Sequence, residues 1–314
     1  MDKYYRYSNY LKNKYGTRTY KIPINLALTC PNRDGNIAEG GCTYCGEGGA
    51  SFSEDQEVSR NEVLHKKERI ATKYRAEKFI AYFQNFTNTY LPLDQLKSNI
   101  EQVLGIDEIV EIALATRPDC ISQDYVAQIM KLIHKSTTEP TLTFELGLQS
   151  TNYHTLEEIN RGHTLAEFID AVLTAHRYNA EIGAHIILNL PGDDKLDARE
   201  AAKIVSALKV ENVKLHALYI REDTQLADQY QQGELELISL AEYIDRVIEF
   251  LEHLDPKIAV QRLIGKAPRE GTLFVNWDYN YDQINNFILE EMERRNSWQG
   301  KKFDYLNGKA LSKL

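Results

Sequence analysis

Residues 30–49 read CPNRDGNIAEGGCTYCGEGG, and this stretch carries three of the four cysteines of the 314-residue chain. Cys30, Cys42 and Cys45 follow the spacing C-x11-C-x2-C, with Tyr44 directly before the last of them. Six of the 17 glycines also lie here, which indicates backbone that wraps closely around a bulky object. In a chain of this length, clustered cysteines are more typical of metal ligands or catalysts than of a disulfide scaffold.

Three thiolates leave one position open at a four-ligand metal centre. A 4Fe–4S cluster would then keep one iron free for a small molecule. Zinc would instead need a fourth ligand, such as His65 or His163. Zinc ribbons usually carry paired C-x2-C motifs, so the single one in this chain favours the cluster. Three free buried thiols are the remaining alternative, and they would not explain the local excess of glycine.

Short apolar runs alternate with helical patterns along the chain, which is typical of parallel βαβ units. We expect strands at 20–29, 78–84, 108–115, 141–148, 182–190 and 212–220. We expect helices at about 54–77, 92–104, 120–135, 164–178, 195–208 and 239–253, then a short apolar run at 258–263 and a last helix near 281–295.

This order predicts the α/β class, as a partial (β/α)6 TIM-like barrel with a C-terminal extension. We divide the chain into a Tyr-rich basic segment (1–20), the barrel (21–233) and the extension (234–314). The cysteine stretch follows the first expected strand, so it belongs to the loops that carry the chemistry of a barrel.

The cysteine stretch, continued to GGASF, resembles the radical S-adenosylmethionine (SAM) superfamily. Within it the sequence is similar to the YhcC/YtqA-like group, which is related to the radical SAM domain of the Elongator catalytic subunit. The resemblance covers about residues 20–275, and the long first gap between cysteines is a feature of this group. It implies that Cys30, Cys42 and Cys45 hold a 4Fe–4S cluster whose open iron binds SAM.

Further motifs follow successive strands. Residues 84–87 (QNFT) stand where relatives carry a Gly-rich segment that holds the SAM amino group, with two glycines replaced. TRPD at 116–119 is similar to the Elongator-type motif, and ELGLQS at 145–150 ends the fourth strand. Coproporphyrinogen-oxidising relatives bind SAM through a glutamine at that strand end and an arginine twelve residues later, and His185 stands where they place a SAM-binding aspartate. The resemblance thus implies a SAM site made of Gln84, Asn85, Thr87, Glu145, Gln149, Arg161 and His185.

VKLH at 213–216 and RLIG at 262–265 match the same group, and they imply Lys214, His216 and Arg262 as substrate-side residues. Each position also has a simpler interpretation. Gln149 could merely end a strand, Arg161 could pair with Glu158, and the two histidines could belong to the core. The order of the motifs after successive strands favours the resemblance.

The resemblance implies an enzyme that cleaves SAM to methionine and a 5′-deoxyadenosyl radical, which then takes hydrogen from a substrate. It points to the tRNA wobble uridine, with conversion of 5-carboxymethylaminomethyl-(2-thio)uridine to 5-aminomethyl-(2-thio)uridine. It also implies an electron donor such as flavodoxin or ferredoxin. Two alternatives stay open: a radical SAM enzyme acting on a small molecule or peptide, and a non-catalytic zinc-stabilised RNA-binding module.

The net charge of −9 argues against a dedicated nucleic-acid coat. Basic residues nevertheless gather in residues 1–21, 66–78 and 293–314, and six tyrosines accompany those of the first segment. These segments predict contacts to tRNA, with ordinary solvated surface as the alternative. No apolar run is long enough for a membrane span, and the N-terminus lacks the apolar core of a signal peptide, so we expect a cytoplasmic location without membrane contact.

Overall fold

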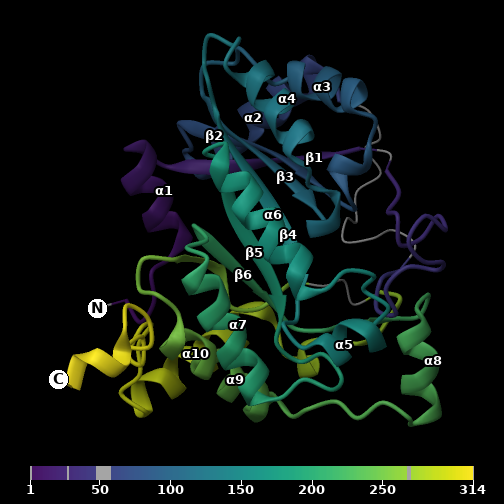
Figure 1. Ribbon diagram of the computed structural model, residues 1–314, viewed down its shortest axis with the longest axis vertical. Helices are drawn as coiled ribbons and strands as arrows, with labels where there is room; N and C mark the ends of the chain where they lie inside the picture. The colour runs from purple at the N-terminus through teal and green to yellow at the C-terminus, as the bar shows by residue number, and fades with distance from the viewer. Residues whose placement is uncertain (1, 27, 47–57, 267–269, 314) are drawn as a thin grey trace.

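A computed structural model of the protein describes residues 2–26, 28–46, 58–266 and 270–313 (Figure 1). Its main sheet is parallel and contains seven strands in chain order. They are β1 (Thr19–Asn25), β2 (Lys78–Gln84), β3 (Ile109–Thr116), β4 (Thr141–Gln149), β5 (Glu181–Ile187), β6 (Asn212–His216) and β8 (Ala259–Arg262). The sheet curls into an open barrel, so the predicted α/β partial barrel is confirmed.

Helices connect these strands and cover the outer face of the sheet (Figure 1). The helices that the sequence predicted are α2 (Arg60–Tyr74), α3 (Leu93–Glu101), α4 (Gln123–Ile133), α6 (Leu165–Arg177), α7 (Lys195–Ala207), α9 (Leu240–His253) and α10 (Tyr281–Arg294). Polar N-cap residues begin most of them, as with Ser122 before α4 and Thr164 before α6. The expected start of the first helix, at 54–57, lies outside the described residues.

Several elements were not predicted. They are α1 (Tyr7–Tyr15), α5 (Tyr153–Glu158), α8 (Gln225–Gln232) and the antiparallel pair β7 (Ile220–Arg221) with β9 (Thr272–Phe274). The strand β8 was expected only as an apolar run in the C-terminal extension, yet it pairs with β6 and completes the sheet. The extension therefore contributes to the barrel itself.

Strand ends differ from the expectation for a simple reason. The strands β1, β5 and β6 end at Asn25, Ile187 and His216, three to four residues before the predicted ends. Each stops where its neighbour stops: Asn25 pairs with Gln84, and Ile187 pairs with His216. The apolar residues beyond these pairs belong to loops over the sheet edge. Pro23 is tolerated in β1 because this strand lies at the edge of the sheet.

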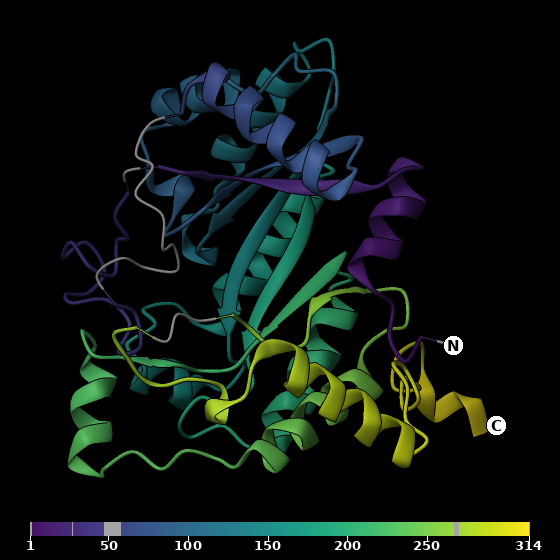
Figure 2. The ribbon, with the colours of Figure 1, turned by 180° about the vertical axis from the view of Figure 1, so that it is seen from behind.

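Helix α1 packs against both edge strands, β1 and β8, and so covers the open seam of the barrel. Tyr5 accepts a backbone hydrogen bond from Val260 of β8 at 2.8 Å. The two ends of the chain lie close together, as both views show (Figure 2), and Gln299 donates a backbone hydrogen bond to Lys3 at 2.9 Å. The division that we placed at residue 20 falls inside the strand β1.

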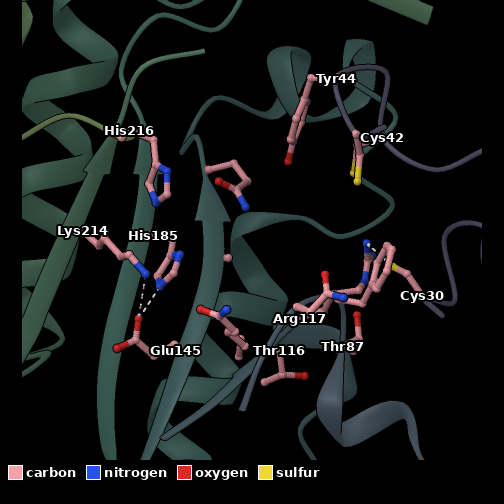
Figure 3. A pocket seen from close by; sticks show the side chains of 18 of the residues that line it. Cys30, Cys42, Tyr44, Thr87, Thr116, Arg117, Glu145, His185, Lys214 and His216 are labelled. Atoms are coloured by element: carbon pink, nitrogen blue, oxygen red, sulfur yellow. Dashed lines mark hydrogen bonds and ion pairs between the residues drawn. The ribbon is translucent and has the colours of Figure 1, made fainter. Parts of the chain in front are cut away.

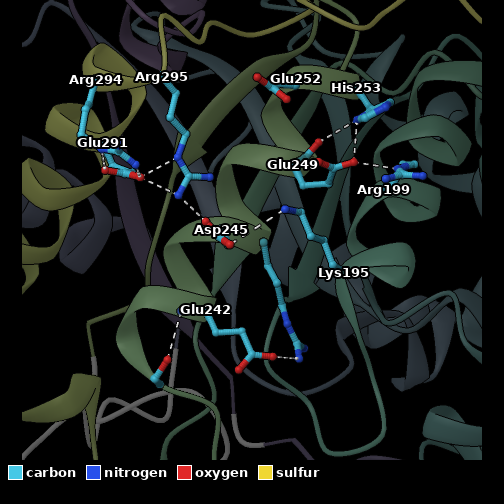
Figure 4. A network of polar contacts seen from close by, with 12 residues as sticks. Lys195, Arg199, Glu242, Asp245, Glu249, Glu252, His253, Glu291, Arg294 and Arg295 are labelled. Carbon is cyan, nitrogen blue, oxygen red and sulfur yellow. Dashed lines mark hydrogen bonds and ion pairs between the residues drawn. The ribbon is translucent and has the colours of Figure 1, made fainter.

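Many basic residues of the two terminal segments form ion pairs with acidic residues of the same chain. Lys14 pairs with Glu181 at 2.6 Å, and Tyr7 is buried. Near the C-terminus, Arg295 pairs with Asp245 of α9, and other cations pair with acidic residues of α9 and α10 (Figure 4). Much of the charge that we predicted to meet tRNA is therefore neutralised by the protein's own carboxylates.

Exposed cations remain at α2, where Arg69, Lys73 and Arg75 are exposed, and in the N-terminal segment, where Lys12 and Arg18 are exposed. None of the helices in the described part of the chain is long and apolar enough to cross a membrane.

Candidate active site

A cavity of about 280 Å³ opens at the carboxyl ends of the strands. The three cysteines and Tyr44 line one end, and side chains from β4, β5, β6 and β8 line the other (Figure 3). Every residue that the sequence assigned to cluster, SAM or substrate lines this one cavity. The fold therefore brings together residues that are up to 232 positions apart along the chain, from Cys30 to Arg262.

The loop that follows α5 holds the cysteine stretch in place. Asn32 donates to the carbonyl of Asn160 at 2.5 Å, and the Asn160 side chain donates to the carbonyl of Gly41 at 2.8 Å. Gly162 has a φ of +75°, and a Cβ at this position would lie 2.2 Å from Oδ1 of Asn32. Only glycine allows the two loops to approach so closely.

An arginine accompanies each cysteine sulfur. The Nη1 atoms of Arg33, Arg117 and Arg161 lie 3.7, 3.9 and 3.6 Å from the sulfurs of Cys45, Cys30 and Cys42, respectively. Of these three arginines, Arg161 is the one predicted from the sequence as a site residue, and Arg33 and Arg117 were not assigned. Arg117 was visible only as part of the TRPD motif, in which Asp119 now holds its guanidinium through two hydrogen bonds of 2.8 and 2.6 Å.

These arginines favour negative charge on the sulfurs. Burial is the larger influence on Cys45: it raises the pKa of this thiol to about 11, with a further contribution from Cys42 and opposition from Arg33. The free thiol is consequently protonated at neutral pH, and binding of a metal centre must displace this proton.

The backbone at two strand ends has left-handed conformations. Asn85 and Phe86, after β2, have φ values of 86° and 38°, and Gln149, at the end of β4, has a φ of 71°. Such conformations are unusual for residues with a side chain and often occur at ligand sites. Among the described residues, Oδ1 of Asn85 and Nε of Arg161 are buried without a hydrogen-bond partner. The cavity thus presents unsatisfied polar atoms to a ligand.

Glu145 is the centre of a polar network at the other end of the cavity. Its Oε1 accepts from Lys21 at 2.5 Å and from Gln261 at 2.8 Å, and its Oε2 lies 2.5 Å from Nε2 of His185 and 3.8 Å from Nζ of Lys214. Four protein groups therefore surround the two carboxylate oxygens. Despite burial, these neighbours, Lys21 foremost, hold the pKa of Glu145 well below its ordinary value.

Glu145 and His185 were expected to contact SAM directly. In the structure their side chains bind each other (Figure 3), and burial lowers the pKa of His185 to about 4. Glu145 thus contacts both His185 and Lys214. Beyond them, Nη2 of Arg262 lies 2.7 Å from Nδ1 of His216.

The two proposed zinc ligands are placed elsewhere or are already engaged. His65 is exposed on α2, and both ring nitrogens of His163 face carbonyls, of Gly147 at 3.0 Å and of Thr164 at 3.2 Å. The described residues contain no group of three His, Cys, Asp or Glu side chains arranged to hold a single metal ion.

Comparison with known proteins establishes the family. The Radical SAM superfamily profile matches residues 29–205, and the Radical_SAM C-terminal domain profile matches residues 210–294. The chain belongs to the radical SAM superfamily, and it is a radical SAM enzyme. Members of this superfamily use a 4Fe–4S cluster and SAM, and these are the cofactors of this protein.

Within the superfamily the chain is similar to protein YtqA of Bacillus subtilis (strain 168), with 34% identity over 97% of this chain and 94% of YtqA. It is also similar to protein YhcC of Escherichia coli (strain K12), with 31% identity over 86% of each chain. The resemblance to the YhcC/YtqA-like group is confirmed. A tRNA uridine(34) acetyltransferase of Methanocaldococcus jannaschii is 26% identical over 51% of this chain and 30% of its own length.

The solved structure of archaeal Methanocaldococcus infernus Elp3, with an N-terminal deletion, has the same fold over 90% of this chain and 64% of its own. The TM-score is 0.68 at 16% sequence identity. The cavity described above has the chemistry that the cofactors require: three sulfurs beside three arginines, next to buried polar atoms that lack a partner.

Proposed function

We propose that this radical SAM enzyme modifies the wobble uridine of tRNA, by converting 5-carboxymethylaminomethyl-(2-thio)uridine to 5-aminomethyl-(2-thio)uridine. The observation that carries this proposal is the sequence match to a tRNA uridine(34) acetyltransferase over half of the chain. The shared fold with Elp3 agrees with it. The exposed cations of α2, together with Lys12 and Arg18 near the N-terminus, offer a surface for RNA phosphates.

In this proposal Cys30, Cys42 and Cys45 hold the cluster. Once bound, the 4Fe–4S cluster supplies the electron that cleaves SAM and so provides the species that takes a hydrogen atom from the substrate. The three arginines beside the sulfurs balance the negative charge of the thiolates. As reductant we infer a small electron carrier such as flavodoxin or ferredoxin.

The SAM site lies between the cysteines and the strand ends. The backbone of 84–87, with its left-handed residues, presents polar groups to the amino end of SAM. Gln149 and Arg161 lie beside Gly147, where a Cβ would be 2.7 Å from Gln149 and 2.8 Å from Arg161. Both side chains therefore depend on glycine at position 147 for their place in the cavity.

The substrate chemistry suits this arrangement. A methylene between an amine and a carboxylate loses a hydrogen atom readily, because the resulting radical is stabilised by both neighbours. Loss of a second electron, which the oxidised cluster could accept, and of the amine proton would give an imine. Water would then cleave the carbon–nitrogen bond, releasing glyoxylate and leaving the aminomethyl group on the base. Buried side chains line much of the cavity, which reduces contact of the reacting carbon with bulk water.

The test is nucleoside analysis of tRNA from cells that lack this protein. We expect the carboxymethylaminomethyl form to accumulate, and we expect the gene to restore the aminomethyl form. A Cys42→Ala variant should not restore it, whereas Cys120→Ala should, because Cys120 does not line the cavity. Unchanged wobble uridines in the deletion strain would contradict the tRNA proposal and favour a small-molecule or peptide substrate.

A further inference from the structure

The end of the cavity opposite the cysteines contains more positive than negative charge. Lys214 and Arg262 line it, and Lys21 lies behind Glu145. Glu145 is the single carboxylate among the described residues that line the cavity. Since its oxygens already meet Lys21, Gln261, His185 and Lys214, it has no free acceptor for a further cation.

Arg262 makes no direct contact with the carboxylate of Glu145, in contrast to Lys21 and Lys214. No ion pair joins Arg262 to an acidic side chain in the described part of the chain, and its Nε is buried there without a hydrogen-bond partner. Among the described residues, its Nη2 contacts the imidazole of His216, whose pKa burial lowers well below the ordinary value. A neutral histidine does not compensate the charge of a buried guanidinium.

Lys214 is next to Arg262 on the paired strand, because Lys214 of β6 pairs with Arg262 of β8. The Lys214 side chain is 13% exposed, and its Nζ donates to the hydroxyl of Tyr82 at 3.2 Å. Burial lowers the pKa of both cations, which means that each would gain from a negative charge placed between them.

We infer that Arg262 and Lys214 form a carboxylate-binding site inside the barrel, which selects substrates that carry a carboxylate on the reacting group. This inference rests on the proposed function, in which the substrate side chain ends in such a group. Arginine suits this task because its guanidinium can donate two parallel hydrogen bonds to one carboxylate. His216 contacts Nη2 of the guanidinium, and Nε has no hydrogen-bond partner among the described residues.

The experiment compares two anticodon stem–loop RNAs that differ in one functional group. One carries 5-carboxymethylaminomethyluridine at the wobble position, and the other carries the corresponding carboxamide. Binding to cluster-loaded protein is measured by fluorescence anisotropy, anaerobically and without reductant, so that no turnover occurs. We expect wild type to bind the carboxylate RNA roughly tenfold more tightly than the carboxamide RNA.

Arg262→Gln should bring the ratio of the two affinities close to one, because the substituted side chain carries no charge. Arg262→Lys should keep part of the preference, because the charge remains. Arg177→Gln, an exposed arginine of α6 outside the cavity, is the matched control and should behave as wild type. The preference is a ratio measured within one variant, so a lower folded fraction does not alter it. A wild-type preference in Arg262→Gln would overturn the inference.

A second measurement separates this inference from the tRNA proposal. Sarcosine (N-methylglycine) carries the same amine, methylene and carboxylate, and sarcosinamide is its neutral match. We expect sarcosine at millimolar concentration to raise the melting temperature of wild type but not of Arg262→Gln, and sarcosinamide to affect neither. If the RNAs fail to bind but sarcosine acts through Arg262, the tRNA proposal fails and the carboxylate site stands. If inorganic phosphate stabilises wild type and sarcosine does not, the assignment to a carboxylate is wrong.

Discussion

Asn85 and Phe86 show how individual residues can preserve a site after its expected glycines are lost. Both keep the left-handed backbone that glycine would adopt without strain. Asn88 holds this turn: its Nδ2 donates towards the carbonyls of Phe83, Asn85 and Ala115 at 3.0, 3.2 and 2.8 Å. A buried amide therefore compensates the conformational cost, which is about 1–3 kcal/mol for each such residue.

Substitution of single cysteines tests the assignment of the cluster ligands. We expect Cys30→Ala, Cys42→Ala and Cys45→Ala each to lose the 4Fe–4S cluster, because three thiolates are the minimum set that holds it with one iron open. Iron and sulfide analysis after anaerobic reconstitution measures this, with about four irons per chain in wild type. Cys120→Ala is the control, and it should keep the iron. Full iron content in any of the three variants would contradict the assignment.

The second test concerns His163 and pH. Burial, with Arg161 and Arg117 nearby, lowers the pKa of His163 to about 2. The unfolded chain takes up this proton near the ordinary value of 6.5, so the stabilising contribution is complete above pH 6.5 and declines as the pH falls. Between pH 6.5 and 4.5, we expect this group to account for a loss of about 2 kcal/mol in the free energy of unfolding.

His163→Gln removes this titration, so its free energy of unfolding should fall less steeply with acid than that of wild type. Urea unfolding at several pH values gives both curves. A constant difference between the two proteins from pH 7 to 4.5 would show that His163 takes up its proton at the ordinary pH in the folded protein.

At the scale of elements, α1 has a structural role that its composition concealed. Tyr15 and Lys14 meet the buried carboxylate of Glu111 at 2.6 and 3.5 Å, and Tyr10 donates to Glu181 at 2.9 Å. The helix therefore neutralises acidic residues at the amino ends of β3 and β5 while it covers the seam of the barrel. Alternating tyrosines and cations are equally typical of an RNA-binding surface. Only the packing of the folded chain distinguishes such a surface from a helix that covers the barrel.

Two tyrosines of α1 allow a matched comparison. Tyr15→Phe removes a hydrogen bond to a buried carboxylate, and we expect it to lower the free energy of unfolding by about 1.5–3 kcal/mol. The Tyr7 hydroxyl is buried with no hydrogen-bond partner among the described residues, so Tyr7→Phe should change stability by less than about 0.5 kcal/mol or increase it. Chemical denaturation of both variants checks this, and equal effects would be inconsistent with the distinct environments of the two hydroxyls.

At the scale of the whole molecule, the chain ends are joined to the barrel near the start of β8. The buried side chain of Gln299 donates to the carbonyls of Asp255 and Ile258 at 2.7 and 2.8 Å and accepts from the backbone of Tyr5 at 2.7 Å. Gln299 thus links the N-terminal segment, the C-terminal segment and the turn directly before β8. We expect the protein to unfold as one cooperative unit.

Gln299→Ala leaves the carbonyl of Ile258 and the backbone amide of Tyr5 without partners, and it removes one of the two hydrogen bonds to the carbonyl of Asp255. We expect a loss of about 2–3 kcal/mol in the free energy of unfolding, still in a single transition. Gln232→Ala, at the exposed end of α8, is the control and should stay within about 0.5 kcal/mol of wild type. Circular dichroism during urea unfolding follows both variants. A separate early transition in Gln299→Ala would mean that the terminal segments and the barrel unfold independently.

The sequence alone determined the parallel βα order, the position of the cysteine loop after the first strand and the family, because periodicity and short motifs are local properties of the chain. Tertiary structure decided that β8 joins the sheet, since a four-residue strand has too weak a pattern to stand out. It also placed Arg33 and Arg117 beside the sulfurs, surrounded the carboxylate of Glu145 with Lys21, Gln261, His185 and Lys214, and packed α1 against the seam. These features depend on contacts between distant segments, and no spacing within one segment encodes which partner a charged side chain will meet.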